Sequence, residues 1–160
     1  MFLKVLMLKQ DDPRKCSAAK LVKFGLAKPV TRTASRTLIL NPFSKKILLK
    51  SDKKFVNSIT GIDCSWNLVT SAFKKPFTGI SRKLPPLLAG NPMNYSKLNK
   101  LSTVEALAGA VYILGEPELT HNLLQKFKWG NTFFELNKNL LQDYSKAKSE
   151  AEILEICHEY

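Results

Sequence analysis

Asp63 and Trp66 are the residues of this sequence whose types and spacing most directly suggest chemistry. Asp63 follows an apolar, strand-like run that begins at Thr60, and Trp66 opens the next segment. A carboxylate at the end of a strand can act as a general base or orient a cationic ligand group. An indole face attracts a cation or stacks on a base. Two structural interpretations compete: Asp63 as the N-cap of a helix that begins at Ser65, and Trp66 as core packing.

Two expected helix starts could bind an anion through backbone groups alone. Ser102 and Glu105 form a capping box, with Ser at the N-cap and Glu three residues later. Ser17 follows Asp11-Asp12-Pro13, where an Asp N-cap and a first-turn Pro predict another helix start. The N–H groups of a first turn are unpaired and lie at the positive end of the helix dipole. A carboxylate or phosphate could therefore bind near Ser17 or near Thr103, although plain capping explains the same residues.

The other reactive side chains form no recognisable catalytic or metal-binding motif. His121 and His158 have no histidine or acidic partner at metal-ligand spacing, so we expect no metal site. The three cysteines have no CxxC spacing, and their odd number indicates reduced thiols in a cytosolic protein. The sequence contains no GxGxxG, GxxxxGK[ST] or GxSxG. Ordinary dinucleotide, nucleoside triphosphate and hydrolase mechanisms thus lose their main support.

Positive charge is concentrated in the first part of the chain. Residues 1–100 contain 20 Lys or Arg and 4 Asp or Glu, whereas residues 101–160 contain 5 and 9. Such a distribution is typical of a protein that binds a polyanion, because each neutralised phosphate releases counterions. A solvated lysine surface is the alternative. We favour nucleic acid as the partner.

Alternating strand and helix patterns in the first half predict an α/β layer with a largely parallel sheet. Ligands of such sheets bind at the carboxyl ends of the strands, where Asp63 and Trp66 would lie. Apolar runs predict strands at Phe2 to Leu8, Thr37 to Leu40, Ile47 to Leu49 and Thr60 to Cys64. Capping and stop signals predict helices from Asp11-Asp12-Pro13 to Gly25, from Ser51 or Asp52 to Val56, and from Ser65 to about Ala72.

The second half is expected to be helical. Lys74 to Tyr95 is rich in Pro, Gly and basic residues and should be mostly loop, with a possible strand at Lys83 to Leu88. The capping box begins an apolar helix that Gly115 ends. Further helices should follow from Pro117, with breaks near Gly130 and near Ser145 or Lys148. We therefore expect an α/β part over residues 1–90 and a helical part over residues 91–160.

The sequence gives no sign of membrane insertion. No apolar run approaches the ~20 residues that a bilayer-spanning helix needs. Met1 to Leu8 is short for a signal segment, is interrupted by Lys4 and precedes no small-residue cleavage site. We expect a monomer in the cytoplasm.

Several phrases in a fixed order resemble the ribosomal RNA aminocarboxypropyltransferases, which act on a uridine or pseudouridine of small-subunit rRNA. The resemblance covers about Phe2 to Tyr144. Its carriers are Asp11-Asp12-Pro13-Arg14-Lys15-Cys16-Ser17, Leu40-Asn41-Pro42, Asp63-Cys64-Ser65-Trp66, Leu84-Pro85, Asn91-Pro92-Met93-Asn94-Tyr95, Lys100-Leu101-Ser102-Thr103-Val104-Glu105-Ala106 and Lys126-Phe127-Lys128-Trp129-Gly130.

The resemblance implies a fold and a reaction. The fold would be similar to that of SPOUT methyltransferases: an α/β layer with a parallel sheet and a deep trefoil knot, followed by an all-helical C-terminal part. The enzyme would use S-adenosyl-L-methionine but transfer its 3-amino-3-carboxypropyl arm to N3 of the target base, releasing methylthioadenosine. Its partner would be small-subunit rRNA or a pre-ribosomal particle.

The same resemblance assigns expected roles by position. Ser17 would bind the methionyl carboxylate with help from the Thr103 backbone, and Trp66 would pack near the reactive arm. Asp63, also near the arm, would orient it or accept a proton. Ribose would meet the backbone of Ile62, the adenine would meet Leu84 and its neighbours, and the loop with Asn99 would border the pocket.

Two departures from the family pattern are visible. Ser17 stands where the family commonly has Thr, which keeps the hydroxyl. Ser96-Lys97-Leu98 replaces a Gly-Arg/Lys-Pro run, and this affects the loop that holds Asn99. Two other functions compete: a SPOUT-like RNA methyltransferase, and a non-enzymatic rRNA-binding assembly factor.

Overall fold

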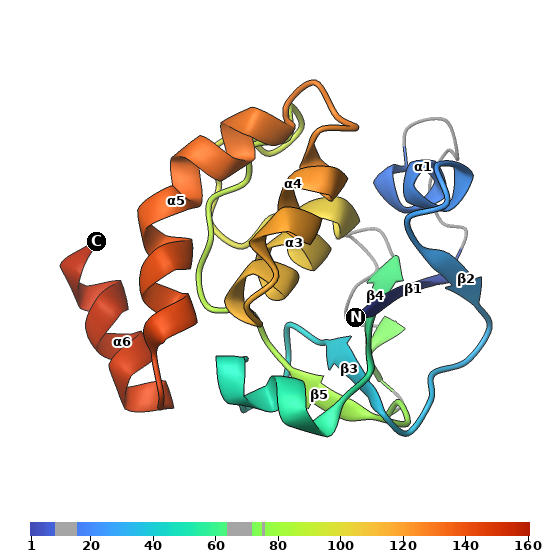
Figure 1. Ribbon diagram of the computed structural model, residues 1–160, viewed down its shortest axis with the longest axis horizontal. Coiled ribbons are helices and arrows are strands. Elements are labelled where there is room, and N and C mark those ends of the chain that lie inside the picture. Colours follow the sequence, from blue (N-terminus) through green and yellow to red (C-terminus); the bar gives the residue numbers. More distant parts are fainter. Residues whose placement is uncertain (9–15, 64–71, 75) are drawn as a thin grey trace.

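A five-stranded parallel sheet lies on one side of the molecule, and most of the helices lie on the other (Figure 1). The computed structural model describes residues 1–8, 16–63, 72–74 and 76–160. All strand pairs are parallel and the order is β2-β1-β4-β3-β5. The strands are β1 (Phe2–Met7), β2 (Lys28–Val30), β3 (Thr37–Leu40), β4 (Ser58–Asp63) and β5 (Ile80–Arg82). The predicted α/β class with a parallel sheet is confirmed.

The helices are concentrated in the second half of the chain. They are α1 (Ser17–Lys23), the 3-10 helix η1 (Lys50–Phe55), α3 (Thr103–Ile113), α4 (Pro117–Leu124), α5 (Gly130–Lys146) and α6 (Glu150–Glu159). Every element described after β5 is a helix. None of the described helices is both long and apolar enough to cross a membrane.

β4 is the central strand, and its sequence suits that position. Five of its six residues are buried, as expected for a parallel strand that is covered on both faces. Its buried hydroxyls are satisfied by a neighbour on β3: the oxygen atoms Thr37 Oγ1 and Thr60 Oγ1 are 2.7 Å apart, and Ser58 Oγ donates to Thr37 Oγ1 at 2.8 Å. Because each of these hydroxyls has a hydrogen-bond partner, the polar groups at the centre of the sheet avoid the desolvation penalty of a buried, unpaired group.

Helix α3 packs directly on β4 and is surrounded by other elements (Figure 1). Gly61 permits this approach, because a Cβ atom added there would lie 3.2 Å from Thr103 Cγ2. Eight residues of α3 are buried, including Gly109 and Glu105. The amino end of α3 therefore lies beside the carboxyl end of β4.

The segment after β5 is held by side chains of α5 instead of by a strand. Asn137 Oδ1 accepts a hydrogen bond from Leu88 N, and Asn137 Nδ2 donates to Leu88 O, both at 2.8 Å. Tyr144 donates its hydroxyl proton to Pro86 O at 2.8 Å. Gly90 also lies against this helix, because a Cβ atom there would come within 2.5 Å of Phe133 N. Helix α5 thus fixes the path of residues 86–90.

Several sequence predictions hold in the structure. The strand at Thr37–Leu40 and the helix that begins at the Ser102 capping box are both present. Gly25 and Gly115, with φ values of 73° and 94°, follow the ends of α1 and α3 as helix stop signals. The predicted strand at Thr60 begins two residues earlier, at Ser58.

Other predictions were wrong. Ile47 to Leu49 is not a strand but contributes one isolated bridge, between Ile47 and Lys83. The strand expected at Lys83 to Leu88 lies earlier, as β5, because Pro85 and Pro86 have no N–H to donate. The edge strand β2 was not predicted; it has Pro29 at its centre, which an edge position tolerates. The expected helix start at residues 11–13 and most of the helix at 65–72 lie outside the described residues.

Replacing Asn137 should destabilise the protein strongly. Asn137→Ala leaves the N–H and C=O of Leu88 without their partners, which should cost about 1–3 kcal/mol of unfolding free energy. Asn139→Ala, an exposed asparagine of the same helix, should change it by no more than about 0.5 kcal/mol. Urea unfolding followed by circular dichroism measures both. Equal stability of the two variants would contradict the role given to Asn137.

Candidate functional site

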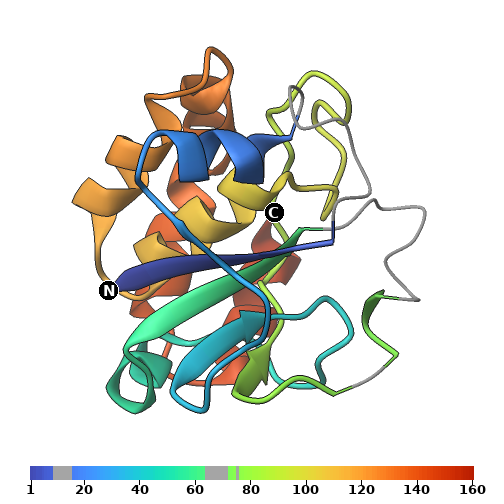
Figure 2. The ribbon, with the colours of Figure 1, turned by 90° about the vertical axis from the view of Figure 1, so that its right-hand side faces the viewer.

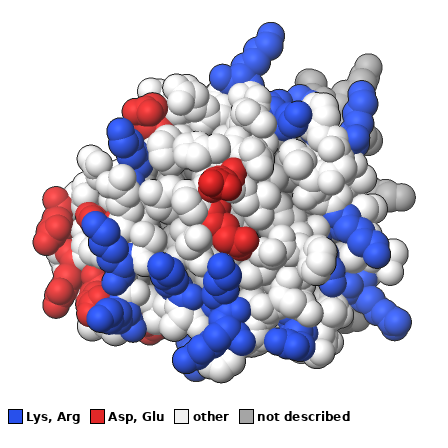
Figure 3. All heavy atoms as spheres, in the orientation of Figure 1, with Lys and Arg blue, Asp and Glu red and all other residues white. Residues whose placement is uncertain are grey.

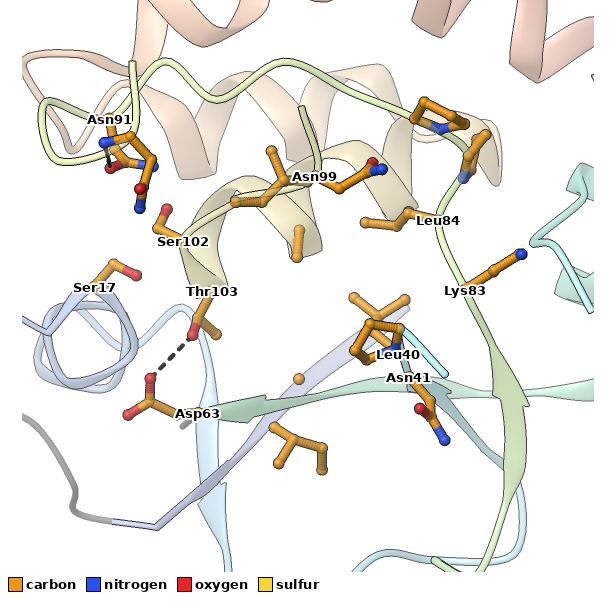
Figure 4. A pocket seen from close by; sticks show the side chains of 18 of the residues that line it. Ser17, Leu40, Asn41, Asp63, Lys83, Leu84, Asn91, Asn99, Ser102 and Thr103 are labelled. Carbon is orange, nitrogen blue, oxygen red and sulfur yellow. Dashed lines mark hydrogen bonds between the residues drawn. The ribbon is translucent and has the colours of Figure 1, made fainter. Parts of the chain in front are cut away.

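A cavity of about 980 Å³ opens where β4 and β3 end and α1 and α3 begin. Figure 4 shows side chains from these elements around it. Its volume is at the upper end of the range for small-molecule sites, roughly 300–1,000 Å³. Six of the expected site residues line it, namely Ser17, Ile62, Asp63, Leu84, Asn99 and Thr103. The seventh, Trp66, lies outside the described residues.

Asp63 joins three elements at the inner end of the cavity. It ends β4, and only 9% of its surface is exposed. Its Oδ1 accepts a hydrogen bond from Thr103 Oγ1 at 3.0 Å (Figure 4), and its Oδ2 accepts one from Cys16 Sγ at 3.0 Å. Thr103 begins α3 and Cys16 precedes α1, so a single carboxylate holds the amino ends of two helices at the end of the central strand.

The contact with Asp63 also fixes the state of the Cys16 thiol. Burial and the hydrogen bond to Asp63 raise the pKa of Cys16 from 9.0 to about 11. At neutral pH the sulfur therefore keeps its proton and donates it to the carboxylate. Cys16 was expected only to be a reduced thiol, and its position beside Asp63 was not foreseen.

Ser17 and α3 face each other across the cavity floor. The Ser17 hydroxyl oxygen accepts a hydrogen bond from Val104 N at 3.3 Å. The N-cap of α3 is Ser102, whose side chain accepts from Glu105 N. The first turn of an 11-residue helix and a hydroxyl from a second helix thus meet at one place. Val104 N and Glu105 N are paired in this way, so an anionic group here would bind through the helix dipole, the Thr103 N–H and the Ser17 O–H.

Glu105 connects this helix start to the loop that covers it. Its side chain is fully buried. Glu105 Oε1 accepts from Ser102 N at 2.8 Å and from Asn91 Nδ2 at 2.6 Å, while Oε2 accepts from Gly90 N at 2.6 Å. The sequence predicted the capping box but gave no sign that the same carboxylate also binds residues 90 and 91.

Ile62, Leu84 and Asn99 lie farther along the cavity. β3 pairs with β4 only as far as Leu40 and Gly61, whereas β1 continues to Asp63. The Ile62 backbone therefore faces the gap that opens beside β3. In Figure 4 Asn99 and Leu84 lie together, on the other side of the first turn of α3 from Ser17. Asn99 has a φ of 60°, and its N–H donates to Leu87 O at 2.9 Å.

Helix α6 supplies a wall that the sequence did not predict. Ile153, Leu154 and Cys157 line the cavity. Helix α6 is attached to the sheet side by Glu150 Oε1, which accepts from Ile47 N at 2.8 Å. No short motif encodes this contact, because it joins residues 103 positions apart.

Charge is unevenly spread over the surface. On the face shown in Figure 3, Lys and Arg gather along the lower edge, where Figure 1 places η1 and β5. Acidic side chains gather over α6 at the left.

Within the described part of the chain, no group of three His, Cys, Asp or Glu side chains could hold a metal ion.

Two family models match the sequence. The family described as "Ribosome biogenesis protein, C-terminal" matches residues 38–160. A possible Fer4-like domain in RNase L inhibitor matches residues 4–35. That shorter stretch contains a single cysteine, Cys16, and so lacks the four thiolates that hold an iron–sulfur cluster.

Relatives of similar length carry one name. The chain is 40% identical to a 16S rRNA aminocarboxypropyltransferase of Methanococcoides burtonii, with 99% of this chain and 94% of the relative covered. It is 45% identical to a protein of the same name from Sulfurisphaera tokodaii, with 94% and 89% covered.

A solved structure agrees with both the fold and the name. The SAM-dependent rRNA:acp-transferase Tsr3 of Vulcanisaeta distributa matches with a TM-score of 0.84 and 37% identity, over 89% of this chain and 82% of that one. The resemblance inferred from the sequence motifs is thereby confirmed. With a matching family model, near full-length relatives and a shared fold, the chain belongs to the family of 16S rRNA aminocarboxypropyltransferases.

Proposed function

We propose that this protein transfers the 3-amino-3-carboxypropyl group of S-adenosyl-L-methionine to N3 of a uridine or pseudouridine in small-subunit rRNA, releasing methylthioadenosine. The observation that carries this function is the cavity at the carboxyl ends of the strands. It brings together six residues that the family resemblance assigns to the cofactor and the reaction. Relatives named for the same reaction support it.

The cavity fits S-adenosyl-L-methionine at both ends. The amino end of α3 and the Ser17 hydroxyl suit the methionyl carboxylate, with the Thr103 backbone contributing a donor. The backbone of Ile62 would hold the ribose in the gap beside β3. Leu84 and its proline neighbours form an apolar wall for the adenine, and the loop with Asn99 borders it. Trp66 would pack near the reactive arm.

The chemistry depends on which carbon of the sulfonium faces the base. Attack by N3 forms an N–C bond, breaks the bond from sulfur to the aminocarboxypropyl carbon and leaves the electron pair on sulfur. The protein must hold that carbon in line with N3 and shield the methyl carbon. The sulfonium is already an activated leaving group, so we propose that no metal takes part.

Asp63 is proposed to accept the N3 proton. A carboxylate offers about four lone-pair sites, and the described residues donate one hydrogen bond to each oxygen. With respect to the described part of the chain, each oxygen therefore keeps a lone pair that can accept from the base. Thr103 and Cys16 hold the carboxylate in a fixed orientation, which lowers the cost of arranging it during the reaction.

Residues 1–90 are proposed to supply the RNA surface and much of the cofactor site, and residues 91–160 to complete the pocket. Ser17, Ile62 and Asp63 come from the first part, whereas Asn99, Thr103 and the α6 wall come from the second. We further propose a SPOUT-like layer with a deep trefoil knot, an all-helical C-terminal part, and a monomer that acts in the cytoplasm on rRNA or a pre-ribosomal particle.

A labelling experiment tests the reaction. The protein is incubated with small-subunit rRNA and S-adenosyl-L-methionine that carries label either on the methyl carbon or on the carboxyl carbon. Only the carboxyl label should enter RNA, because the aminocarboxypropyl arm is transferred. Entry of the methyl label would identify a SPOUT-like methyltransferase instead. Entry of neither label would favour a non-enzymatic rRNA-binding assembly factor.

Asp63→Asn should slow the chemical step by about 10²–10⁴-fold, the usual contribution of a positioned general base. Cofactor affinity should change little, because the amide keeps an oxygen that can accept from Thr103. The residual rate should rise with pH as solvent takes over removal of the N3 proton. Single-turnover rates and calorimetric titration separate the two effects. Full turnover of the variant would rule out the proton-accepting role.

Cys16 should resist alkylation until the solution is strongly alkaline. Its pKa of about 11 keeps the thiolate scarce near neutral pH, and the thiolate is the nucleophile. Labelling with iodoacetamide, followed by mass spectrometry of the Cys16 peptide, should therefore be slow at neutral pH and accelerate about tenfold per pH unit until it levels off near pH 11. In Asp63→Asn the rise should occur at lower pH, since the carboxylate no longer raises the pKa. Rapid labelling of the wild type at pH 8 would contradict this arrangement.

A further inference from the structure

Three phenylalanines form a cluster at the rim of the cavity. Phe43 follows β3, and Phe73 and Phe77 precede β5. The ring centroids of Phe43 and Phe73 are 5.9 Å apart and those of Phe73 and Phe77 are 5.7 Å apart, both in edge-on arrangements. Phe73 lines the cavity, together with Asn41 and Pro42 of the loop that carries Phe43. The cluster thus continues the cavity wall outward.

This cluster does not belong to the hydrophobic core. The core contains residues from β1 to α6 and includes none of the three phenylalanines, even among its partly buried members. Phe43 leaves 55% of its surface exposed. Edge-on contact with Phe73 holds the Phe43 ring in place, so the exposed ring is supported by a neighbour that lines the cavity. Stability of the core does not explain such a ring.

Cations flank the cluster in the sequence. Residues 41–46 and 72–83 contain Lys45, Lys46, Lys74, Lys75, Arg82 and Lys83 and no acidic residue. Lys45, Lys46 and Lys74 are exposed, and Lys83 lines the cavity. In Figure 2 the loop after β3 lies where the strands end, whereas residues 76–79 lead back to the start of β5. An aromatic ring among cations at the mouth of a pocket matches a single-stranded nucleic acid, whose bases stack while its phosphates bind lysine.

The proposed reaction requires an unpaired base, and the phenylalanine cluster can stabilise one. N3 of a uridine is the atom that donates in its Watson–Crick pair, so it can react only when the base is unpaired. An enzyme that modifies a base must take it out of the stack, which leaves its neighbour without a stacking partner. An exposed ring at the rim can replace the lost partner. RNA recognition commonly uses aromatic side chains on unpaired bases in this way.

We propose that Phe43 stacks on the nucleotide next to the target base, while Lys45 and Lys46 contact the flanking phosphates. The proposal rests on the function proposed above and adds the form of the acceptor to it. The substrate is an unpaired or looped RNA segment that crosses the cavity rim over Phe43. Phe73 supports the ring from the cavity side.

The test compares Phe43→Ala with a matched control, Phe55→Ala. Phe55 is 53% exposed and follows Lys53 and Lys54, but it ends η1 just before β4, away from the cavity. Fluorescence anisotropy measures the affinity of each variant for a labelled hairpin RNA with a uridine-containing loop and for a fully paired duplex. Calorimetry measures the affinity for S-adenosyl-L-methionine.

Phe43→Ala should weaken binding of the hairpin loop by about 5- to 150-fold, the range for one base–aromatic stack. It should leave duplex binding and cofactor affinity unchanged, because neither uses the ring. Phe43→Trp should restore loop binding. Phe55→Ala should behave as the wild type on both RNAs.

Three results would overturn the proposal: loop affinity of Phe43→Ala equal to that of the wild type, equal losses on loop and duplex, or an equal loss in Phe55→Ala. Wild-type loop affinity of Phe43→Ala would indicate that the cluster binds a protein instead of RNA. The outcome is independent of the labelling experiment. If Phe43→Ala weakens binding of the hairpin loop alone and the carboxyl label does not enter RNA, the stacking surface is supported and the proposed reaction is rejected.

Discussion

The Glu105 carboxylate is the interaction on which the rest of the site depends. A carboxylate without exposed surface is costly unless several donors satisfy it. Glu105 has three, from Ser102 N, Gly90 N and Asn91 Nδ2, and it lies in the first turn of α3, where the dipole favours negative charge. Because one residue satisfies both the helix start and the loop, neither can move without leaving the other unpaired.

Asp63 makes a second constraint on the opposite side of the same helix start. Glu105 attaches α3 to the loop at residues 90 and 91, and Asp63 attaches it to β4 and to Cys16. The first turn of α3 is therefore fixed between two carboxylates that belong to different layers. A site built in this way is organised before its ligand arrives, so little binding energy is spent on ordering it.

Much of this arrangement could be predicted from local sequence signals. The capping box at Ser102 and the strand that ends at Asp63 each depend on a few adjacent residues, and the fold confirms both elements. The wall made by α6 and the pairing of Asn137 with Leu88 could not be predicted, because they join positions far apart in the chain. β2 was missed for a related reason: an edge position tolerates Pro29, and only the tertiary context shows that it is an edge.

The distribution of charge around the cavity gives an RNA acceptor a preferred direction of approach. Helix α6, one wall of the cavity, contains Glu150, Glu152, Glu155 and Glu159. The segments on the sheet side, residues 41–46 and 72–83, contain only cations among their charged residues. A phosphate backbone is repelled by the first and attracted by the second. The RNA strand would therefore cross the rim over residues 41–46 and 72–83. A base turned into the cavity would then meet the apolar part of α6 at Ile153 and Leu154. The cations of residues 41–46 and 72–83 thus favour approach of a polyanion along these segments, whereas the acidic residues of α6 disfavour approach along the helix.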